Sequence, residues 1–518
     1  MSEHSHRAPA EFAVELDRSG GPLPAQLAAR LREVIDGGVL RPGEAIPATR
    51  ALASRLAVAR GVVVAAYEQL IAEGYLRAER GRGTVVNPEL PPSVPAAGEE
   101  PRAPGAPGAP GGPGAGPRDA DGPDAAGGAG RAERDAAPAA GSETMPRPPL
   151  APGTPLTDVA SRPAWRAAWR AAAAQADRPP PALGDARLRA ELAEHLRLVR
   201  GTARPAGDVL VTAGAREGLG LLLTALSAGR PGGLVVGVED PGYPSLRGVA
   251  ARHGARIVSL PVDADGLRTE QLPSGLLDLV IVTPSHQYPV GGSLPLPRRR
   301  ELLDWARRTG VLIVEDDYDS ELRQVGSPLP ALAALDDPAA GSVVTLGTFS
   351  STVTPALAAG FLLAPASLRA LLEPVRRDLG SPVSAVTQLA LADYLASGEL
   401  RRNIARVRRR HASRRDLLSE RLAGVPGVRI RPTSGGLHAV VELAGEPREA
   451  LRREEETVAS SREPAPGFPG GLGIAALGAY WQHERPDRAA GLVLGLGGPD
   501  DAGFAAAVER LREILLRS

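Results

Sequence analysis

The residues best suited to chemistry in this 518-residue chain follow apolar runs in its second half. A cluster of carboxylates, Glu315 to Glu321, comes directly after the apolar run Val311 to Val314. Burying such charge is costly, and α/β sheets build their binding sites at the carboxyl ends of strands. The phrase Pro284 to Pro289 follows another apolar run and supplies Ser285 and His286. This arrangement predicts one polar site along one edge of a sheet.

Two more segments point to the same edge. Gly214, Ala215 and Arg216 follow an apolar run and open a helical pattern, where backbone N–H groups can hold a phosphate. Tyr243 lies in the turn Glu239 to Pro244, beside that candidate site. Small-residue turns and a histidine at a strand end are also common as structural features. The two segments alone therefore leave a binding site and a structural role both open.

The basic residues set a strict limit on the chemistry, because all 60 are arginine and the chain has neither lysine nor cysteine. These absences exclude a Schiff-base enzyme of the usual kind, a P-loop lysine, disulfides and cysteine-ligated zinc. We predict no metal site. A bias toward GC-rich codons explains arginine on a surface, where either cation serves. It does not explain the loss of a lysine that chemistry requires.

Composition bounds the class of protein. A hydrophobic content of 43% and the length predict a soluble protein of more than one domain. Residues 1–10 are polar and lack the apolar core of a signal peptide, and we find no uncharged apolar run long enough to span a membrane. We therefore expect a cytoplasmic protein. The formal net charge is zero, so any contact with DNA must come from a local patch.

A segment rich in Pro, Gly and Ala divides the chain. Residues 88–155 lack apolar periodicity, which predicts a disordered linker between a head at 11–87 and a body at 156–518. In the body, apolar runs alternate with helical patterns, which favours a mainly parallel α/β sheet. The expected strands are 209–211, 234–236, 257–260, 279–282, 311–314 and 343–346. From about Val383 the pattern predicts a smaller α+β lobe.

The head shows the pattern of a winged helix-turn-helix. Apolar spacing predicts a first helix that ends at Gly37-Gly38, a second from Thr49 to Leu56 with Thr49 as N-cap, a third from Arg60 to Glu73, and then a short hairpin. Four arginines and one acid fall within 20 residues, a local excess that suits phosphate contacts. These arginines are Arg41, Arg50, Arg55 and Arg60. The alternative interpretation is a solvated charged face.

The amino-acid sequence of the head resembles that of the GntR family of winged-helix regulators. The resemblance rests on Arg41-Pro42-Gly43-Glu44, Ile46 to Ala53, Val63 to Leu70 and Gly81-Arg82-Gly83-Thr84. It implies DNA contacts from Arg50, from Arg60 and Gly61 at the start of the third helix, and from Arg82, Gly83 and Thr84 in the wing. The family usually has Ser-Arg-Asn-Thr where this chain has Ala59-Arg60-Gly61-Val62. That change predicts weaker binding or a different operator.

The body resembles the fold-type I aminotransferase domain of the MocR/GabR subfamily of GntR regulators. The matching phrases are Glu239 to Pro244, Thr283 to Pro289 and Glu315 to Glu321. The resemblance implies a homodimer, a double-stranded DNA operator and the cofactor pyridoxal 5'-phosphate (PLP). It assigns Asp316 to the pyridine nitrogen, Tyr318 to the ring hydroxyl and Tyr243 to the ring face. The remaining candidate cofactor residues are Gly214, Ala215, Arg216, Ser285, His286 and Ser350.

Four departures fall on this one site. Ser351 stands where the family has the lysine that binds PLP, and Ala358 stands where it has an arginine for the phosphate. The carboxylate-binding arginine falls at Val493, and a Tyr-Gly-Asp-Pro loop is shortened to Leu183-Gly184-Asp185. We therefore predict no catalytic residue and no covalent PLP. Weak non-covalent binding of PLP, or none, stays open.

These observations predict a DNA-binding transcriptional regulator whose body is a pseudo-aminotransferase serving dimerisation or effector binding. Three alternatives stay open: a working PLP-dependent aminotransferase, a regulator that binds PLP reversibly, and a decayed scaffold.

Overall fold

The structure is a computed structural model of the whole chain. It describes residues 16, 23–36, 39–72, 75–79, 83–88, 147–156, 158–228, 230, 232–324, 330–433, 435–483 and 488–518. Most of the predicted linker, Gly37-Gly38 and the wing tip Arg80 to Arg82 lie outside these residues. Among the described helices, none is both long enough and apolar enough to cross a bilayer.

The head is a winged helix-turn-helix, as predicted. Its elements are α1 (Leu23–Asp36), α2 (Thr49–Arg55), α3 (Arg60–Ala72), β1 (Leu76–Glu79) and β2 (Gly83–Val86). The two strands pair antiparallel. Leucines of α1 and α2 pack against Val63, Tyr67 and Leu70 of α3. The buried Tyr67 hydroxyl donates to the Pro47 carbonyl at 2.7 Å and so ties α3 to the residues before α2.

Two details of the head differ from the prediction or were not predicted. Thr49 is the first residue of α2 and not its N-cap, because Ala48 holds that position without a side-chain hydrogen bond. The turn between α2 and α3 contains Ala57 with φ of +50°, a left-handed conformation that favours glycine. The turn is therefore formed at some cost in backbone strain.

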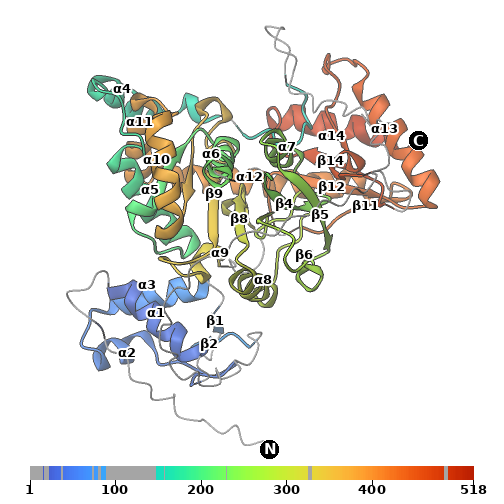
Figure 1. Cartoon of the computed structure of the whole chain (residues 1–518). Coiled ribbons are helices and arrows are strands. Elements are labelled where there is room, and N and C mark those ends of the chain that lie inside the picture. The colour runs from blue at the N-terminus through green and yellow to red at the C-terminus, as the bar shows by residue number, and fades with distance from the viewer. Residues whose placement is uncertain are drawn as a thin grey trace, which may run out of the picture. The chain divides into compact units, whose positions relative to one another are not determined.

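The large domain is built on an eight-stranded sheet (Figure 1). The strand order is β3-β10-β9-β8-β7-β4-β5-β6. The strands are β3 (Val209–Thr212), β4 (Val235–Asp240), β5 (Arg256–Asp263), β6 (Gly266–Leu267), β7 (Leu279–Val282), β8 (Leu312–Asp317), β9 (Val343–Thr348) and β10 (Gly360–Leu363). The central pairs are parallel, as predicted, whereas β10 is antiparallel to both of its neighbours.

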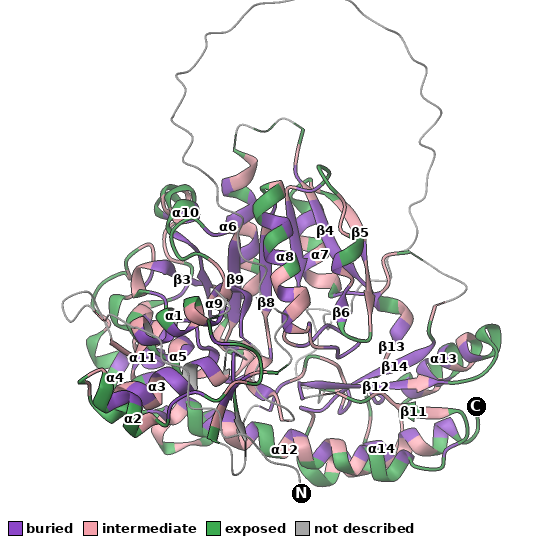
Figure 2. Ribbon diagram, turned by 90° about the horizontal axis from the view of Figure 1, so that it is seen from below, coloured by how far each residue is buried: buried purple, intermediate pink, exposed green. Residues whose placement is uncertain are grey.

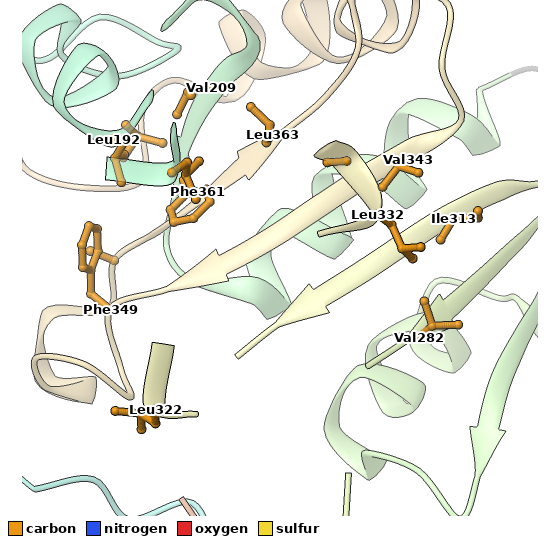
Figure 3. Close-up of a cluster of buried hydrophobic side chains, with 14 of the residues drawn as sticks. Leu192, Val209, Val282, Ile313, Leu322, Leu332, Val343, Phe349, Phe361 and Leu363 are labelled. Atoms are coloured by element: carbon orange, nitrogen blue, oxygen red, sulfur yellow. The ribbon is translucent and has the colours of Figure 1, made fainter. Parts of the chain in front are cut away.

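Alternate residues of these strands pack against helices on the two faces of the sheet. Val280, Val282 and Ile313 contact one cluster, whereas Leu279, Ile281 and Val314 contact the other (Figure 3 shows part of the first). The first face is covered by α5 (Ala186–Arg200), α8 (Leu296–Thr309) and α11 (Ala385–Ala396), and the second by α6 (Ala215–Ser227), α7 (Pro244–Arg252) and α10 (Ala366–Leu379). The remaining helices of the domain are α4 (Pro163–Gln175) and α9 (Leu332–Leu335). Because both faces are covered, these strands are continuous apolar runs (purple in Figure 2).

The C-terminal lobe is α+β, as predicted, but it begins later than the predicted Val383, because Val383 and the buried residues of α11 pack in the large-domain core. It contains an antiparallel sheet of order β11-β12-β14-β13. Its strands are β11 (Val428–Ile430), β12 (His438–Leu443), β13 (Ala475–Ala476) and β14 (Gly491–Gly495), and its helices are α12 (Glu399–Leu422), α13 (Pro447–Arg462) and α14 (Asp501–Leu515). Leu492 and Leu494 of β14 pack against Phe504 and Val508 of α14 in a separate core.

The predicted linker extends too far toward the body. Leu150 is fully buried in the core of the C-terminal lobe. Its N–H donates to the Leu472 carbonyl at 2.9 Å, and its own carbonyl accepts from Gly495 at 2.8 Å. Residues 147–155 are thus part of the body, because a short apolar stretch within a proline-rich segment finds a core that the local composition does not reveal.

Candidate functional site

A cavity of about 350 Å³ opens where the large-domain strands end. Asp316 is the penultimate residue of β8, Thr348 closes β9, and Ala215 begins α6. The lining residues are Gly153, Ala213, Gly214, Ala215, Arg216, Tyr243, Leu246, Tyr288, Asp316, Tyr318, Thr348, Ser350, Ser351, Pro355, Ala358 and Leu437. The cavity therefore gathers the turn before α6, the loop after β4 and the ends of β8 and β9, as expected at the carboxyl edge of the sheet.

Most of the residues singled out in the sequence line this cavity. They are Gly214, Ala215, Arg216, Tyr243, Asp316, Tyr318, Ser350, Ser351 and Ala358. Ser285 and His286 do not line it. The Ser285 hydroxyl accepts a hydrogen bond from Arg200 at 2.8 Å, and the His286 ring lies against Tyr318 and His438. Their part in the site is at most indirect.

Asp316 places a buried carboxyl group in the lining of the cavity. It is 3% exposed, and its Oδ1 has no hydrogen-bond partner among the described residues. Burial raises its pKa to about 8, with further contributions from Asp317, Asp319 and Glu239. An unpaired buried acid is costly, so this position is suited to a ligand that brings a positive charge or an N–H donor.

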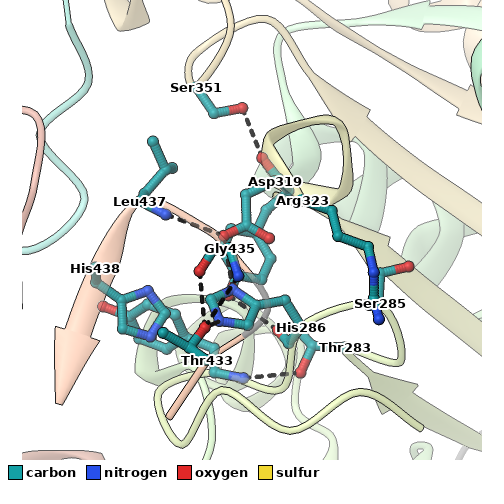
Figure 4. Close-up of polar contacts among 12 residues, drawn as sticks. Thr283, Ser285, His286, Asp319, Arg323, Ser351, Thr433, Gly435, Leu437 and His438 are labelled. Atoms are coloured by element: carbon teal, nitrogen blue, oxygen red, sulfur yellow. Dashed lines mark hydrogen bonds and ion pairs between the residues drawn. The ribbon is translucent and has the colours of Figure 1, made fainter. Parts of the chain in front are cut away.

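A hydrogen-bond network ties the cavity to the C-terminal lobe (Figure 4). The Tyr318 hydroxyl donates to the His286 carbonyl at 2.9 Å, and His286 Nδ1 lies 2.8 Å from Asp319 Oδ2. His286 Nε2 lies 3.0 Å from the Thr433 hydroxyl, which precedes β12. The network fixes the Tyr318 ring and joins it to residues of the second lobe.

His438 adds a neutral ring behind this network. Burial lowers its pKa to about 4, with a smaller effect of His286. Its Nε2 lies 2.8 Å from the Pro289 carbonyl, which can only accept, so Nε2 carries the proton. His438 therefore acts as an uncharged spacer between Tyr288 and His286 at neutral pH.

The residues at the predicted lysine and arginine positions offer no cation to the cavity. The Ser351 hydroxyl donates to the Tyr318 carbonyl at 2.6 Å, so it is already engaged (Figure 4). Ala358 has φ of +43° and presents only a methyl group. Neither side chain can replace an amine or a guanidinium.

Val493, which stands where the family has its carboxylate-binding arginine, is fully buried in an apolar cluster. Its neighbours there are Tyr288, Val440, Leu477 and Tyr480. Tyr288 belongs both to this cluster and to the cavity lining. The wall of the cavity on this side is therefore aromatic and aliphatic, and Val493 brings it no charge.

Sequence reasoning missed several lining residues. Tyr288 lies inside a phrase that was recognised, yet only its edge contacts with Tyr243 and Tyr318 place it in the cavity. Leu437 comes from the C-terminal lobe, and Gly153 from the segment predicted to be linker. No local pattern distinguishes the last two, because their position depends on how distant segments pack.

In the head, the predicted DNA-binding residues that the structure describes lie on the surface. Arg41, Arg50, Arg60 and Gly61 are exposed. Arg60 Nε lies 3.5 Å from the Thr49 hydroxyl, which brings the N-terminal ends of α3 and α2 together. Gly83 begins β2 and is exposed, and Thr84 is half-buried beside it. Arg82 lies outside the described residues.

Comparisons with known proteins agree with this architecture. Residues 23–86 match the gntR family of bacterial regulatory proteins, and residues 150–472 match aminotransferase class I and II. The chain is 40% identical to the HTH-type pyridoxine biosynthesis transcriptional regulator PdxR of Corynebacterium glutamicum, over 92% of this chain and 93% of that protein. The chain belongs to the MocR/GabR subfamily of GntR transcriptional regulators. A second MocR-type relative, the probable rhizopine catabolism regulatory protein MocR of Rhizobium meliloti, is 31% identical over 97% of this chain and 95% of its own length.

Solved structures confirm the fold of this MocR-type body. An archaeal alanine:glyoxylate aminotransferase superposes with a TM-score of 0.60 at 21% identity, covering 71% of this chain and 90% of that one. A multiple substrate aminotransferase from Thermococcus profundus also gives 0.60, at 23% identity and 72% and 92% coverage. At such identities the likeness shows the fold alone.

The residues of the cavity fit the non-covalent part of the PLP that this fold implies. The unpaired Asp316 carboxylate suits a pyridine nitrogen that is protonated, and Tyr243 and Tyr318 offer aromatic surface. Gly214 has φ of +92° at the start of α6, where free N–H groups can face a phosphate. The residues do not fit covalent attachment, because the chain contains no lysine.

Proposed function

We propose that this protein is a DNA-binding transcriptional regulator whose aminotransferase-like domain binds PLP reversibly as an effector and does not transaminate. One observation carries the proposal. The cavity keeps an unpaired buried acid and three tyrosines, while the chain has no lysine with which to do chemistry there. A pocket retained without its reactive amine suits sensing better than turnover.

Each kept residue has a definite part in holding the ligand. Asp316 would pair with the pyridine nitrogen, Tyr318 would face the ring hydroxyl, and Tyr243 would pack on the ring. The N–H groups at Gly214 and Ala215 would face the phosphate. In enzymes of this fold PLP acts as an electron sink. Here no side chain that lines the cavity offers an amine to anchor the ligand or to move a proton on it.

We further propose that the controlled genes belong to pyridoxine biosynthesis. The support is the identity of 40% along nearly the whole length of a regulator named for that pathway. A PLP sensor in the control of PLP supply would form a feedback loop.

The test is an anisotropy titration of the purified full chain against DNA upstream of the pyridoxine biosynthesis genes of its own organism, with and without PLP. We expect saturable binding that PLP shifts, no binding of an unrelated duplex at the same salt, and no shift with pyridoxal. Absence of binding at low salt would contradict the regulator. Amino-group transfer by the purified protein from any of a panel of amino acids would contradict the proposal that the body does not transaminate.

We also propose a homodimer, on the strength of the subfamily to which the chain belongs. Light scattering of the purified chain measures its mass directly. A mass near 53.5 kDa at micromolar concentration, which is that of one chain, would contradict the dimer.

A further inference from the structure

The cavity has an uneven distribution of charge. Among the described residues of its lining, only Arg216 is basic and only Asp316 is acidic. Asp316 is buried, whereas Arg216 is exposed, and the three lining tyrosines come from other loops. A ligand that matches this pattern is a flat aromatic group that carries both a positive or N–H-bearing ring atom and an anionic arm.

Arg216 has no obvious structural reason to be where it is. It makes no hydrogen bond or ion pair with any described residue. It also lies in the first turn of α6, where the helix dipole disfavours a cation. Its neighbour Glu217 cannot neutralise it, because the Glu217 carboxylate accepts from the Ala213 N–H and pairs with Arg376. A bound anion would pair with the Arg216 guanidinium and would also offset its unfavourable interaction with the helix dipole.

Another arginine near the ring site is already engaged. Arg247 lines a smaller cavity of about 20 Å³, which Tyr243 also lines, and its guanidinium donates to the Tyr480 carbonyl at 3.5 Å. Ala358, which also lines the main cavity, contributes no charge. The Val493 cluster contributes none either, so Arg216 is the one cation among the described lining residues.

We infer that Arg216 is the side chain that holds the anionic arm of the effector, and that it is the main source of selectivity for a phosphorylated ligand. Because the described lining has a single cation, it suits a ligand with one anionic group. This favours a phosphorylated vitamin B6 form over its adduct with an amino acid, which would bring an unpaired carboxylate toward the apolar wall. The inference deepens the proposed function and relies on it only for the choice of probe.

Calorimetry on the full chain tests this with pyridoxamine 5'-phosphate, pyridoxamine and inorganic phosphate, none of which carries an aldehyde. The variants are Arg216→Ala, Arg216→Lys and, as a matched control, Arg308→Ala, which removes an exposed arginine on α8. We expect the wild type to bind the phosphorylated probe more tightly than pyridoxamine. The Arg216→Ala variant should bind the phosphorylated probe about tenfold or more weakly than the wild type does. The affinity for pyridoxamine should not change. Arg216→Lys should recover most of the loss, and Arg308→Ala should change neither affinity.

The outcomes separate the inference from the proposed function. If wild type prefers the phosphorylated probe and Arg216→Ala keeps that preference, Arg216 is not the anchor, although the sensor stands. If the wild type binds inorganic phosphate through Arg216 as tightly as pyridoxamine 5'-phosphate, the result supports the anion-binding role of Arg216 and contradicts PLP as the effector. If the wild type binds no phosphate-bearing probe, the result contradicts both the role of Arg216 and the proposed PLP sensor. An equal loss for both pyridoxamine forms in Arg216→Ala indicates a structural role and overturns the inference.

Discussion

The unpaired Asp316 makes a prediction whose sign and size can be worked out from its surroundings. In the folded, ligand-free protein its pKa is raised from 3.8 to about 8, first by burial and then by Asp317, Asp319 and Glu239. The folded protein thus keeps a proton that the unfolded chain has already released. The free energy of unfolding therefore falls as pH rises from about 4 to about 8.

The size follows from this difference in proton affinity. Each tenfold difference corresponds to about 1.4 kcal/mol, so the destabilisation at pH 7 is on the order of 4 kcal/mol. The variant Asp316→Asn has nearly the same shape and does not titrate. It should be more stable than wild type, and the gain should be about 3 kcal/mol larger at pH 8.5 than at pH 5.5. Glu239 titrates in both proteins and affects the comparison less.

Thermal unfolding of the ligand-free full chain at several pH values measures this gain as a difference in Tm. The matched control is Asp317→Asn, because the Asp317 carboxylate pairs with Arg200 at 2.9 Å and its loss should destabilise the protein. PLP should stabilise wild type more than Asp316→Asn. A Tm difference between Asp316→Asn and wild type that stays constant from pH 5.5 to 8.5 would refute the reasoning, and so would a less stable variant at pH 8.5.

Three other predictions concern the head and the missing lysine. Ala57→Gly should stabilise the helix-turn-helix by about 1 kcal/mol, because the native φ of +50° is strained for alanine; slower hydrogen exchange in α2 and α3 would show it, and faster exchange would contradict it. Arg50→Ala should weaken binding to operator and unrelated DNA alike and reduce the salt slope by about one, in anisotropy titrations at several salt concentrations; a selective loss of operator binding would instead mean base readout. Borohydride reduction with PLP should leave the peptide that contains Ser351 unmodified by mass spectrometry, whereas Ser351→Lys should gain a pyridoxyl group there; a modified wild-type peptide would contradict the proposed site.

The strands of the large domain show how far local patterns reach. The parallel strands β4, β7, β8 and β9 are largely buried on both faces, so their apolar runs are visible in the sequence. The antiparallel β10 and the short strands of the C-terminal lobe were not predicted, because their pairing depends on partners distant in the chain. Thr49 was misplaced by one position as an N-cap, since the choice between adjacent residues at a helix start depends on backbone geometry.

By itself, the sequence determined the family, the order of domains and the absence of a reactive amine. These follow from local phrases and from composition, and packing cannot change them. The tertiary structure decided which residues of the recognised phrases share one cavity. It placed Ser285 and His286 outside the lining, brought in Tyr288, Gly153 and Leu437, and left Asp316 Oδ1 without a hydrogen-bond partner among the described residues. It also placed Arg216, which has no ion pair among the described residues, in the lining of the same cavity as the buried Asp316. Burial and pairing are properties of the whole packed chain, so no local pattern could have supplied them.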